Sequence, residues 1–326
     1  MTRERRATIT DVARAAGVAT STVSRAFTRP QRVNAATREH VLRVADELGY
    51  VPNPAARAMG TGRTQTLALL VPDLTNPFFS GIITGAEQAA ARAGRTLVVA
   101  DTQESPEREQ HLLTSLDPAV DGFVVAASRL PDDALREAAA RSRIVLLNRA
   151  TPGLPAVVAD YESGTRQVVE HLASLGHREL VFLGGPVGSW SGARRWAGLQ
   201  RACADLGVQA VRWGPYSPTL AGGPGAADAA LAAGARAVVC HNDMLAIGVL
   251  RRLAERGVAV PADISVVGFD DIFGADFCHP PLTTLAERTR DAGSAAVGLL
   301  ISAETDGVTA LPTELRVRAS SGPPRS

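Results

Sequence analysis

The chain has 326 residues, of which 45% are hydrophobic, so it is long enough to bury a sizeable core together with a small additional unit. Its net charge is only +1, but residues 1–63 carry eleven Arg against five acidic residues, and this asymmetry favours a small polyanion-binding unit joined to a mildly acidic body. No segment approaches eighteen uninterrupted apolar residues and no apolar signal region precedes the first helix, which argues against a membrane partner and predicts a soluble, cytoplasmic protein.

The first predicted elements are three short helices within residues 9–50, separated at Gly17-Val18 and at residues 29–31. Small Ala13 permits a close crossing of the first two helices, and Gly17 can take the positive-φ conformation of the turn between them. Thr10 is expected to cap the first helix. This spacing predicts a helix-turn-helix.

The second of these helices presents short hydrogen-bonding side chains and one guanidinium, a surface suited to the major groove of DNA. A solvated helix face of the same composition is the alternative interpretation. The third helix, capped by Asn34 and ended by Gly49, carries an apolar stripe that would complete the core of this all-α head.

A segment rich in Pro and Gly follows the third helix, from Val51 to Thr64, and marks a domain boundary. We therefore divide the chain into a helix-turn-helix head at residues 1–51, a linker at 52–64 and a larger core at 65–326.

The core is predicted to be α/β, because short apolar runs alternate with helical stretches as in parallel βαβ units. The runs lie at 66–71, 96–100, 122–126, 144–147, 179–183, 236–240 and 264–268. Two blocks of similar layout suggest two doubly wound lobes. Ligands of open parallel sheets sit beyond the carboxyl ends of the strands, so the polar loops there should line a cleft between the lobes.

The cysteines and histidines give no sign of a metal, a cofactor or catalysis. Cys203, Cys240 and Cys278 are odd in number and far apart, which predicts buried thiols and no disulfide framework. The six histidines are scattered, and the sequence holds no GxSxG, HExxH, P-loop or GxGxxG fingerprint. We expect no enzymatic turnover.

Seven segments resemble the LacI/GalR family of bacterial transcriptional regulators, and together they extend over nearly the whole chain. They are TITDVARAAGV, TVSRAF, TREHVLRVADELGYVPNPAARAM, LLVPDLTNPFF, DYESGTRQVVEHLASLGHREL, HNDMLAIG and PADISVVGFDD with the later PPLTT. The resemblance implies a periplasmic-binding-protein-like core, a homodimer on a palindromic double-stranded operator, and a small effector bound between the lobes.

In that family the start of the second helix reads base edges, which carries over to Thr20, Ser21 and Arg25, with Thr22 and Ser24 on phosphates. Ala19 stands where the family usually has Ser, so the helix lacks a cap oxygen, at a cost of about 1 kcal/mol. The implied DNA-contacting set is Thr10, Thr20, Ser21, Thr22, Ser24, Arg25, Asn34, Tyr50, Asn53, Ala56, Arg57 and Met59.

The linker segment Asn53–Met59 matches the family's hinge helix, with Asn53 as cap and Pro54 at the first helical position. Seven residues cannot hold a helix alone, so folding would wait for dimerisation and DNA. Met59 stands where Leu is usual as the wedge in the minor groove. A disordered linker is the alternative for the free protein.

The resemblance also implies an effector site on the loops of the cleft. It comprises Phe78, Phe79, Arg149, Asp160, Ser191, Arg195, Tyr216, Asn242 and Asp270. Phe79 is expected to stack on the ligand, and Arg195 to clamp paired hydroxyls or a carboxylate. Core packing is the competing role for both phenylalanines, and for Asp243 and Asp271 we favour turn or helix capping. Trp213 is an alternative to Tyr216 in the wall.

These features predict a sequence-specific transcriptional regulator, most simply a repressor, whose operator affinity is set by a small effector. A sugar is the first candidate because an aromatic face beside hydroxyl partners suits it, and a nucleoside-like ligand is the second. The two-lobed core is shared with solute-binding proteins of transport systems, but these lack a DNA-binding head. The chain has no heptad tail, which favours a dimer.

Overall fold

The computed structural model describes residues 7–50, 63–302 and 306–325, and all structural statements refer to these ranges. The chain divides into two compact units, one formed by residues 1–66 with 119–121 and the other by residues 67–118 with 122–326. The predicted linker residues Asn53, Ala56, Arg57 and Met59 lie outside the described ranges.

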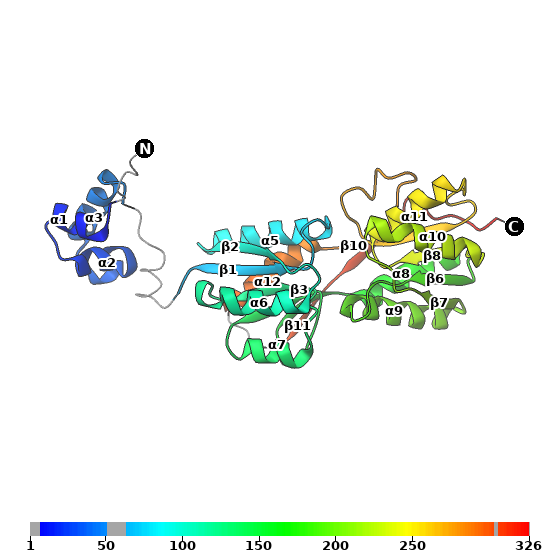
Figure 1. The fold of residues 1–326 in the computed structure, drawn as a ribbon, viewed down its shortest axis with the longest axis horizontal. Coiled ribbons are helices and arrows are strands. Elements are labelled where there is room, and N and C mark those ends of the chain that lie inside the picture. Colours follow the sequence, from blue (N-terminus) through cyan, green and yellow to red (C-terminus); the bar gives the residue numbers. More distant parts are fainter. Residues whose placement is uncertain (1–6, 51–62, 303–305, 326) are drawn as a thin grey trace. The chain divides into compact units, whose positions relative to one another are not determined.

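The smaller unit contains three helices, α1 (Ile9–Ala15), α2 (Thr20–Thr28) and α3 (Ala35–Glu47), with a short 3₁₀ turn at Pro30–Arg32 (Figure 1). Their buried faces meet in one apolar cluster centred on Val12, Val23 and Val41. Gly17 has φ +66°, as the turn between crossed helices requires, so the predicted helix-turn-helix is present.

The caps of these helices differ in part from the prediction. Thr8, and not Thr10, caps α1: its Oγ1 accepts from the Asp11 amide at 3.3 Å, and the Asp11 carboxylate accepts from the Thr8 amide at 2.9 Å. Thr10 is the second residue of α1, because the helix begins two residues earlier than its pattern indicated. Asn34 caps α3 as predicted, and α2 has no side-chain cap at Ala19.

The first lobe of the larger unit is built on a six-stranded sheet of order β11-β5-β4-β3-β1-β2. Its strands are β1 (Thr66–Val71), β2 (Thr96–Asp101), β3 (Phe123–Ala126), β4 (Ile144–Leu147), β5 (Ala156–Ala159) and β11 (Val308–Leu311). Its helices are α5 (Phe78–Arg92), α6 (Pro106–Leu116), α7 (Asp132–Ala139) and α12 (Thr289–Ser302). Helices α5 and α12 pack closely because Gly85 and Gly293 leave room for facing backbone.

The second lobe has a six-stranded sheet of order β12-β10-β9-β8-β6-β7. Its strands are β6 (Glu179–Leu183), β7 (Gln209–Trp213), β8 (Ala237–Cys240), β9 (Ser265–Asp270), β10 (Thr283–Glu287) and β12 (Thr313–Arg316). Four helices cover it: α8 (Tyr161–Ser174), α9 (Trp190–Leu206), α10 (Gly223–Ala232) and α11 (Asp243–Glu255). The sheet is not wholly parallel, since β12 runs antiparallel to β10.

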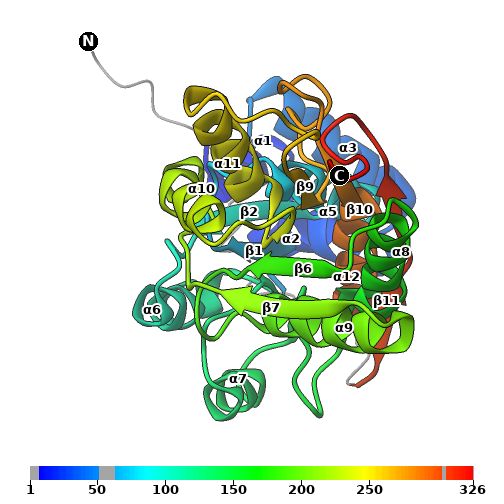
Figure 2. The same ribbon diagram turned by 90° about the vertical axis from the view of Figure 1, so that its right-hand side faces the viewer.

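The helices of the second lobe cover opposite faces of its sheet, two on each (Figure 2). On strand β6, Val181 and Leu183 pack with α10 and α11, whereas Leu180 and Phe182 pack with α8 and α9. This alternation is why a buried parallel strand reads as a continuous apolar run.

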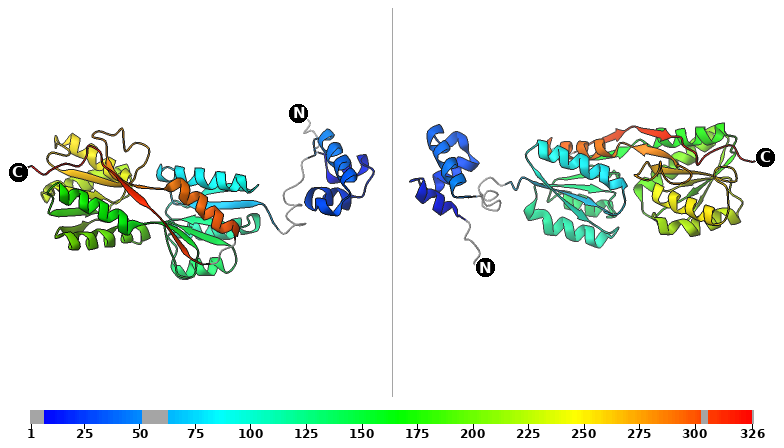
Figure 3. Two further views of the ribbon diagram at one scale, coloured as in Figure 1. Left: turned by 180° about the vertical axis from the view of Figure 1, so that it is seen from behind. Right: turned by 90° about the horizontal axis from the view of Figure 1, so that it is seen from above.

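The chain passes between the two lobes three times (Figure 3). The crossings join β5 to α8, β10 to α12 and β11 to β12. The first lobe therefore comprises residues 67–159 and 289–311, and the second comprises residues 161–287 and 313–325. Among the helices in the described ranges, none is both long and apolar enough to cross a lipid bilayer.

Candidate functional site

Two adjoining hollows lie where loops of the first lobe face loops of the second. They enclose about 740 and 600 Å3 and share Arg129 and the loop Pro186–Gly188, so we treat them as one cleft. The first lobe supplies loops that follow β2, β3 and β4, and the second lobe supplies those that follow β6 and β7. This is the predicted position, beyond the carboxyl ends of parallel strands.

Arg149 lines this cleft as predicted and is held by the loop after β3. Its Nη1 donates to the carbonyl of Ser128 at 2.9 Å, and its Nη2 donates to Asp132 at 2.6 Å. Its Nε is buried and has no hydrogen-bond partner in the described structure. One donor of this guanidinium is therefore left unsatisfied beside the cleft.

The buried carboxylate of Glu109 hydrogen-bonds to the loop that carries Arg129. Glu109 on α6 accepts from the Ser128 hydroxyl and from the Arg129 amide. Burial raises the pKa of Glu109, while these hydrogen bonds and nearby arginines lower it. The Arg129 side chain in turn contacts Glu104, with Nη2 and Oε2 2.6 Å apart, so its guanidinium is held at the cleft.

Arg195 of α9 lies beneath the cleft in a buried polar cluster with Asp270 at the end of β9 and Glu287 at the end of β10. Its Nη2 is 2.7 Å from Asp270 Oδ1 and 2.8 Å from Glu287 Oε1, and its Nη1 donates to the His241 carbonyl at 2.5 Å. These three side chains are each no more than 5% exposed. The predicted pair of Arg195 and Asp270 is thus adjacent. In this structure, however, the two side chains form an ion pair with each other and do not extend into the cleft.

Two aromatic rings enclose the Arg195 guanidinium. Its central carbon lies 5.1 Å from the ring centroid of Tyr161 and 4.7 Å from that of Phe269. Tyr161 begins α8 directly after the first crossing, and Glu287 precedes the second. The cluster therefore joins the body of the second lobe to two of the three inter-lobe crossings. Neighbouring Arg194 is exposed and lies over the ring of Trp190.

His241 is buried between two glycines, Gly185 and Gly192. A Cβ on Gly185 would lie 2.5 Å from its ring, and one on Gly192 would lie 2.9 Å from it. Burial lowers its pKa well below the ordinary value, and the fields of Arg195, Arg129 and Arg212 lower it further. The imidazole is neutral at pH 7, and its buried Nδ1 has no partner in the described structure.

Asn242 and Asp243 follow β8, and the capping role predicted for Asp243 belongs to Asn242. Asn242 caps α11, since its Oδ1 accepts from the Leu245 amide at 3.0 Å, and its Nδ2 donates to the Pro218 carbonyl at 3.0 Å. Asp243 does not cap: it is fully buried and accepts from Thr284 and from the Ile272 amide. Burial raises its pKa to about 7.

Asp271 does not cap a helix either. Its carboxylate accepts from Arg318 at 2.7 Å, and it adopts φ +54°. Capping fails for both aspartates because the tertiary structure brings distant donors to their oxygens, which local sequence does not show.

The other predicted effector contacts are more scattered. Phe78 and Phe79 are 7% and 5% exposed and belong to the first lobe's core, and Phe78 also borders a very small cavity with Asn148 and Glu287. Asp160 caps α8 through the Ser163 amide. Ser191 pairs with the hydroxyl of Ser189, and Tyr216 and Trp213 each border the cleft.

Four residues that line the cleft were not singled out from the sequence: Glu104, Arg129, Trp190 and Arg212. The same holds for His241 and Glu287, which contact the buried Arg195. Arg129 and Arg212 sit on an unpatterned loop and at the end of an exposed edge strand, respectively, so neither periodicity nor a motif marked them. Glu287 ends a strand that was not predicted at all. Trp190 carried a signal, because it begins the helix that bears Arg195.

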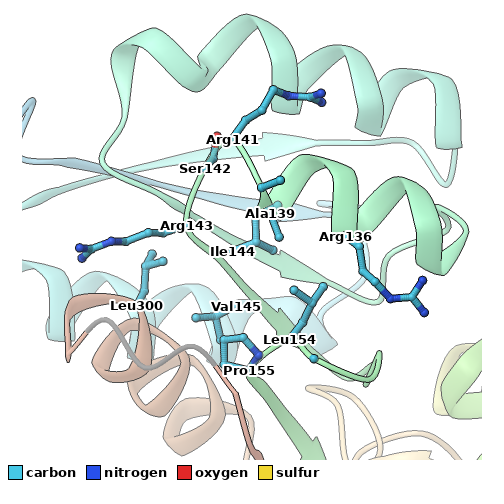
Figure 4. Close-up of a pocket in the computed structure, with 12 residues that line it drawn as sticks. Arg136, Ala139, Arg141, Ser142, Arg143, Ile144, Val145, Leu154, Pro155 and Leu300 are labelled. Carbon is cyan, nitrogen blue, oxygen red and sulfur yellow. The ribbon is translucent and has the colours of Figure 1, made fainter.

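A separate hollow of about 520 Å3 lies on the first lobe, between α7, the loop before β5 and the last turn of α12 (Figure 4). Its arginines do not converge: the Arg136 and Arg141 side chains extend apart (Figure 4), and they pair with Asp133 and Glu137. Its remaining lining is mainly apolar. We therefore assign no polar-ligand site there.

The predicted DNA-reading residues lie in the small unit with mixed exposure. Thr10, Thr20, Ser21, Arg25 and Asn34 are exposed, whereas Thr22, Ser24 and Tyr50 are half-buried. Tyr50 packs edge-on against Phe27, with ring centroids 5.8 Å apart. The exposed set on α2 forms the polar face opposite Val23 and Ala26, which are buried.

Comparisons with known proteins agree with both halves of this architecture. The model of bacterial regulatory proteins of the lacI family matches residues 8–53, and that of the periplasmic binding protein-like domain matches residues 169–321. The HTH-type transcriptional repressor CytR of Escherichia coli K12 is 34% identical over 309 residues, covering 92% of this chain and 90% of CytR.

Solved structures show the same likeness. A lac repressor dimer bound to operator and the anti-inducer ONPF is 29% identical, with a TM-score of 0.87 over 98% of this chain and all of that one. The transcriptional regulator CelR in complex with cellobiose is 30% identical, with a TM-score of 0.72 over 97% of this chain and all of that one.

Proposed function

This chain belongs to the LacI family of bacterial regulatory proteins, and we propose that it represses transcription from a palindromic operator whose affinity is set by an effector bound between the lobes. As in its relatives, the function is gene regulation and not catalysis. The observation that carries the proposal is the combination, in one chain, of a helix-turn-helix with a two-lobed core whose cleft is lined from both sides. A protein acting on the chromosome works in the cytoplasm.

We propose that Thr20, Ser21 and Arg25 read base edges. All three are exposed on α2, and Arg25 makes no ion pair within the part of the chain that the structure describes. An arginine fork matches the two acceptors of guanine in the major groove. For Thr22 and Ser24, which are half-buried on the same helix, we propose contacts to the phosphate backbone.

Arg25→Ala tests this assignment. Loss of one base-reading arginine should weaken operator binding by about 10- to 100-fold, while binding to random duplex changes much less. Arg43→Ala on α3 is the matched control, because Arg43 is also exposed and should leave the preference for operator unchanged. Operators selected from random DNA, titrated by fluorescence anisotropy, supply the measurement. Equal loss on operator and random DNA in Arg25→Ala would contradict base reading.

For the linker residues Asn53, Ala56, Arg57 and Met59 we propose a hinge helix that folds on DNA and inserts Met59 into the minor groove. Met59→Ala should then reduce the bend of a bound operator fragment in a circular-permutation gel assay. An unchanged bend would remove Met59 from this role.

We propose that the effector is a polar metabolite of the sugar or nucleoside type that contacts the second lobe at Arg195, Asn242 and Asp270. Asn242 caps α11, and Asp270 ends β9 beside Arg195. The CelR–cellobiose complex shows a sugar bound by a regulator with the same fold. Phe78, Phe79, Asp160 and Ser191 stay as weaker candidates, since their side chains already pack or cap locally.

The route from effector to DNA in this proposal runs through the crossings between the lobes. A ligand hydroxyl that takes over a bond of Arg195 weakens the guanidinium's contact with Glu287, which directly precedes the β10-to-α12 crossing. The relative rotation of the lobes would then shift between two states. Titrating labelled operator with and without metabolites tests the coupling, and identical affinities under all conditions would refute it.

We propose that the chain acts as a homodimer, as the lac repressor does in its operator complex. Phe273 and Phe277 follow β9 and form an edge-to-face pair with centroids 5.0 Å apart, although they are 83% and 65% exposed. Two large aromatics exposed together suit a contact with a second copy.

A further inference from the structure

We infer that the effector carries a negatively charged oxygen group, a phosphate or a carboxylate, which the arginines of the cleft hold. This inference rests on the proposed effector site and names the chemical class of its ligand. It starts from the charged residues that line the cleft, which are Arg129, Arg149 and Arg212 against the single carboxylate of Glu104.

The three guanidiniums differ in how many hydrogen-bond and ion-pair partners they have within the described structure. Arg129 has Glu104 as an ion-pair partner at 2.6 Å, and Arg149 has Asp132 at 2.6 Å but keeps a buried, unpartnered Nε. Arg212 has no acidic partner within 4 Å among the residues that the structure describes. The cleft therefore retains positive charge that no carboxylate of the chain neutralises.

The position of Arg212 is built into the fold. Its Nε would lie 2.8 Å from a Cβ on Gly184, so the guanidinium occupies the space that a side chain there would fill. Gly184 in turn donates to the Trp213 carbonyl at 2.8 Å and accepts from the Tyr216 amide at 2.9 Å. These backbone hydrogen bonds fix the loop that follows Arg212.

Two arginines of the cleft also act on a buried neighbour, His241, which packs against Gly185 and Gly192. Besides burial, Arg195, Arg129 and Arg212 each lower the pKa of His241. A neutral ligand offers no opposite charge to the Arg212 guanidinium, which is exposed and lines the cleft. An anionic oxygen pair offers the guanidinium two parallel charge-assisted hydrogen bonds.

The walls of the cleft suit the rest of such a ligand. Trp190 and Trp213 are half-buried and line the larger hollow, where they offer flat apolar faces to a sugar ring or a base. The ligand class that fits both features is a sugar or nucleoside that also bears a phosphate or carboxylate.

The test uses the full chain and matched pairs of probes. Glucose is compared with glucose 6-phosphate and with glucuronate, adenosine with AMP, and inorganic phosphate serves as an anion without a ring. Two of the three tryptophans line the cleft, so their fluorescence reports binding directly, and thermal shift gives a second readout. We expect an anionic member of at least one pair to bind at least 10-fold more tightly than its neutral partner. Comparing glucose 6-phosphate with glucuronate then identifies whether the anionic group is a phosphate or a carboxylate.

Variants of Arg212 assign the preference to the cleft. Arg212→Gln should reduce the ratio of anionic to neutral affinity about 10-fold, and Arg212→Lys, which keeps the charge without the fork, should give an intermediate ratio. Arg251→Gln is the matched control: Arg251 is exposed on α11, lies outside the cleft lining, and should leave the ratio unchanged.

Three results would overturn the inference. Neutral probes that bind as tightly as their anionic partners, or an unchanged ratio in Arg212→Gln, would show that the arginines do not select an anion. If neutral probes nevertheless shift operator affinity, effector control stands and only the anionic class fails. If no probe of either class binds at millimolar concentration, both the anionic class and the sugar or nucleoside effector proposed above fail.

Discussion

Removal of the Arg195 guanidinium should be among the most destabilising single changes in the second lobe. In Arg195→Met the apolar chain is retained, but Asp270 and Glu287, each about 5% exposed or less, lose the cation that bridges them. The His241 carbonyl also loses its donor at 2.5 Å. Breaking a buried ion pair from one side typically costs about 3–5 kcal/mol, because the remaining charge is uncompensated.

Arg194→Met is the matched control, since this neighbour is exposed and contacts only the face of Trp190, at 5.4 Å. We expect it to change the free energy of unfolding by no more than about 1 kcal/mol. Urea unfolding followed by tryptophan fluorescence suits both variants, because Trp190, Trp196 and Trp213 all lie in the second lobe.

A triple variant separates charge from packing. Adding Asp270→Asn and Glu287→Gln to Arg195→Met removes both orphaned charges and should recover a large part of the lost stability. The reasoning is refuted if Arg195→Met loses no more stability than Arg194→Met, or if the triple variant is less stable than Arg195→Met alone.

Three further predictions concern other parts of the chain. Ala19→Ser supplies the missing cap of α2 and should stabilise that helix by about 1 kcal/mol, seen as slower amide hydrogen exchange in α2; unchanged exchange would contradict the missing cap. The pKa of Asp243 is raised from 3.8 to about 7, so its stabilising contribution is complete below pH 3.8 and is lost as pH rises to 7. Relative to Asp243→Asn, the native chain should therefore gain stability as pH falls from 7 to 5, by at most about 1.4 kcal/mol per pH unit. Urea unfolding measures this, and the same pH dependence of the unfolding free energy in both proteins would refute it. Phe273→Ala with Phe277→Ala should weaken dimerisation at least 10-fold in analytical ultracentrifugation while leaving the monomer folded, and an unchanged dimer would place the interface elsewhere.

The sequence alone determined the classes of element and their order. Periodicity and turn residues identified the three helices of the small unit and most strands of the core, because 3.6-residue and continuous apolar patterns are local properties of the chain. The strands missed at the outset were β5, β7, β10, β11 and β12. Of these, β7, β11 and β12 have exposed or mixed positions, which weaken the apolar pattern.

Which polar side chains meet was decided by the tertiary structure. Arg195 and Asp270 were expected at the cleft, but only the packed lobe brings in Glu287 from 92 positions away and closes the cluster against itself. Arg212 lies at the cleft, where Gly184, the residue after the neighbouring strand β6, leaves space for its guanidinium. Such contacts depend on which strands pair and how the chain crosses between lobes, and a one-dimensional pattern does not carry that information.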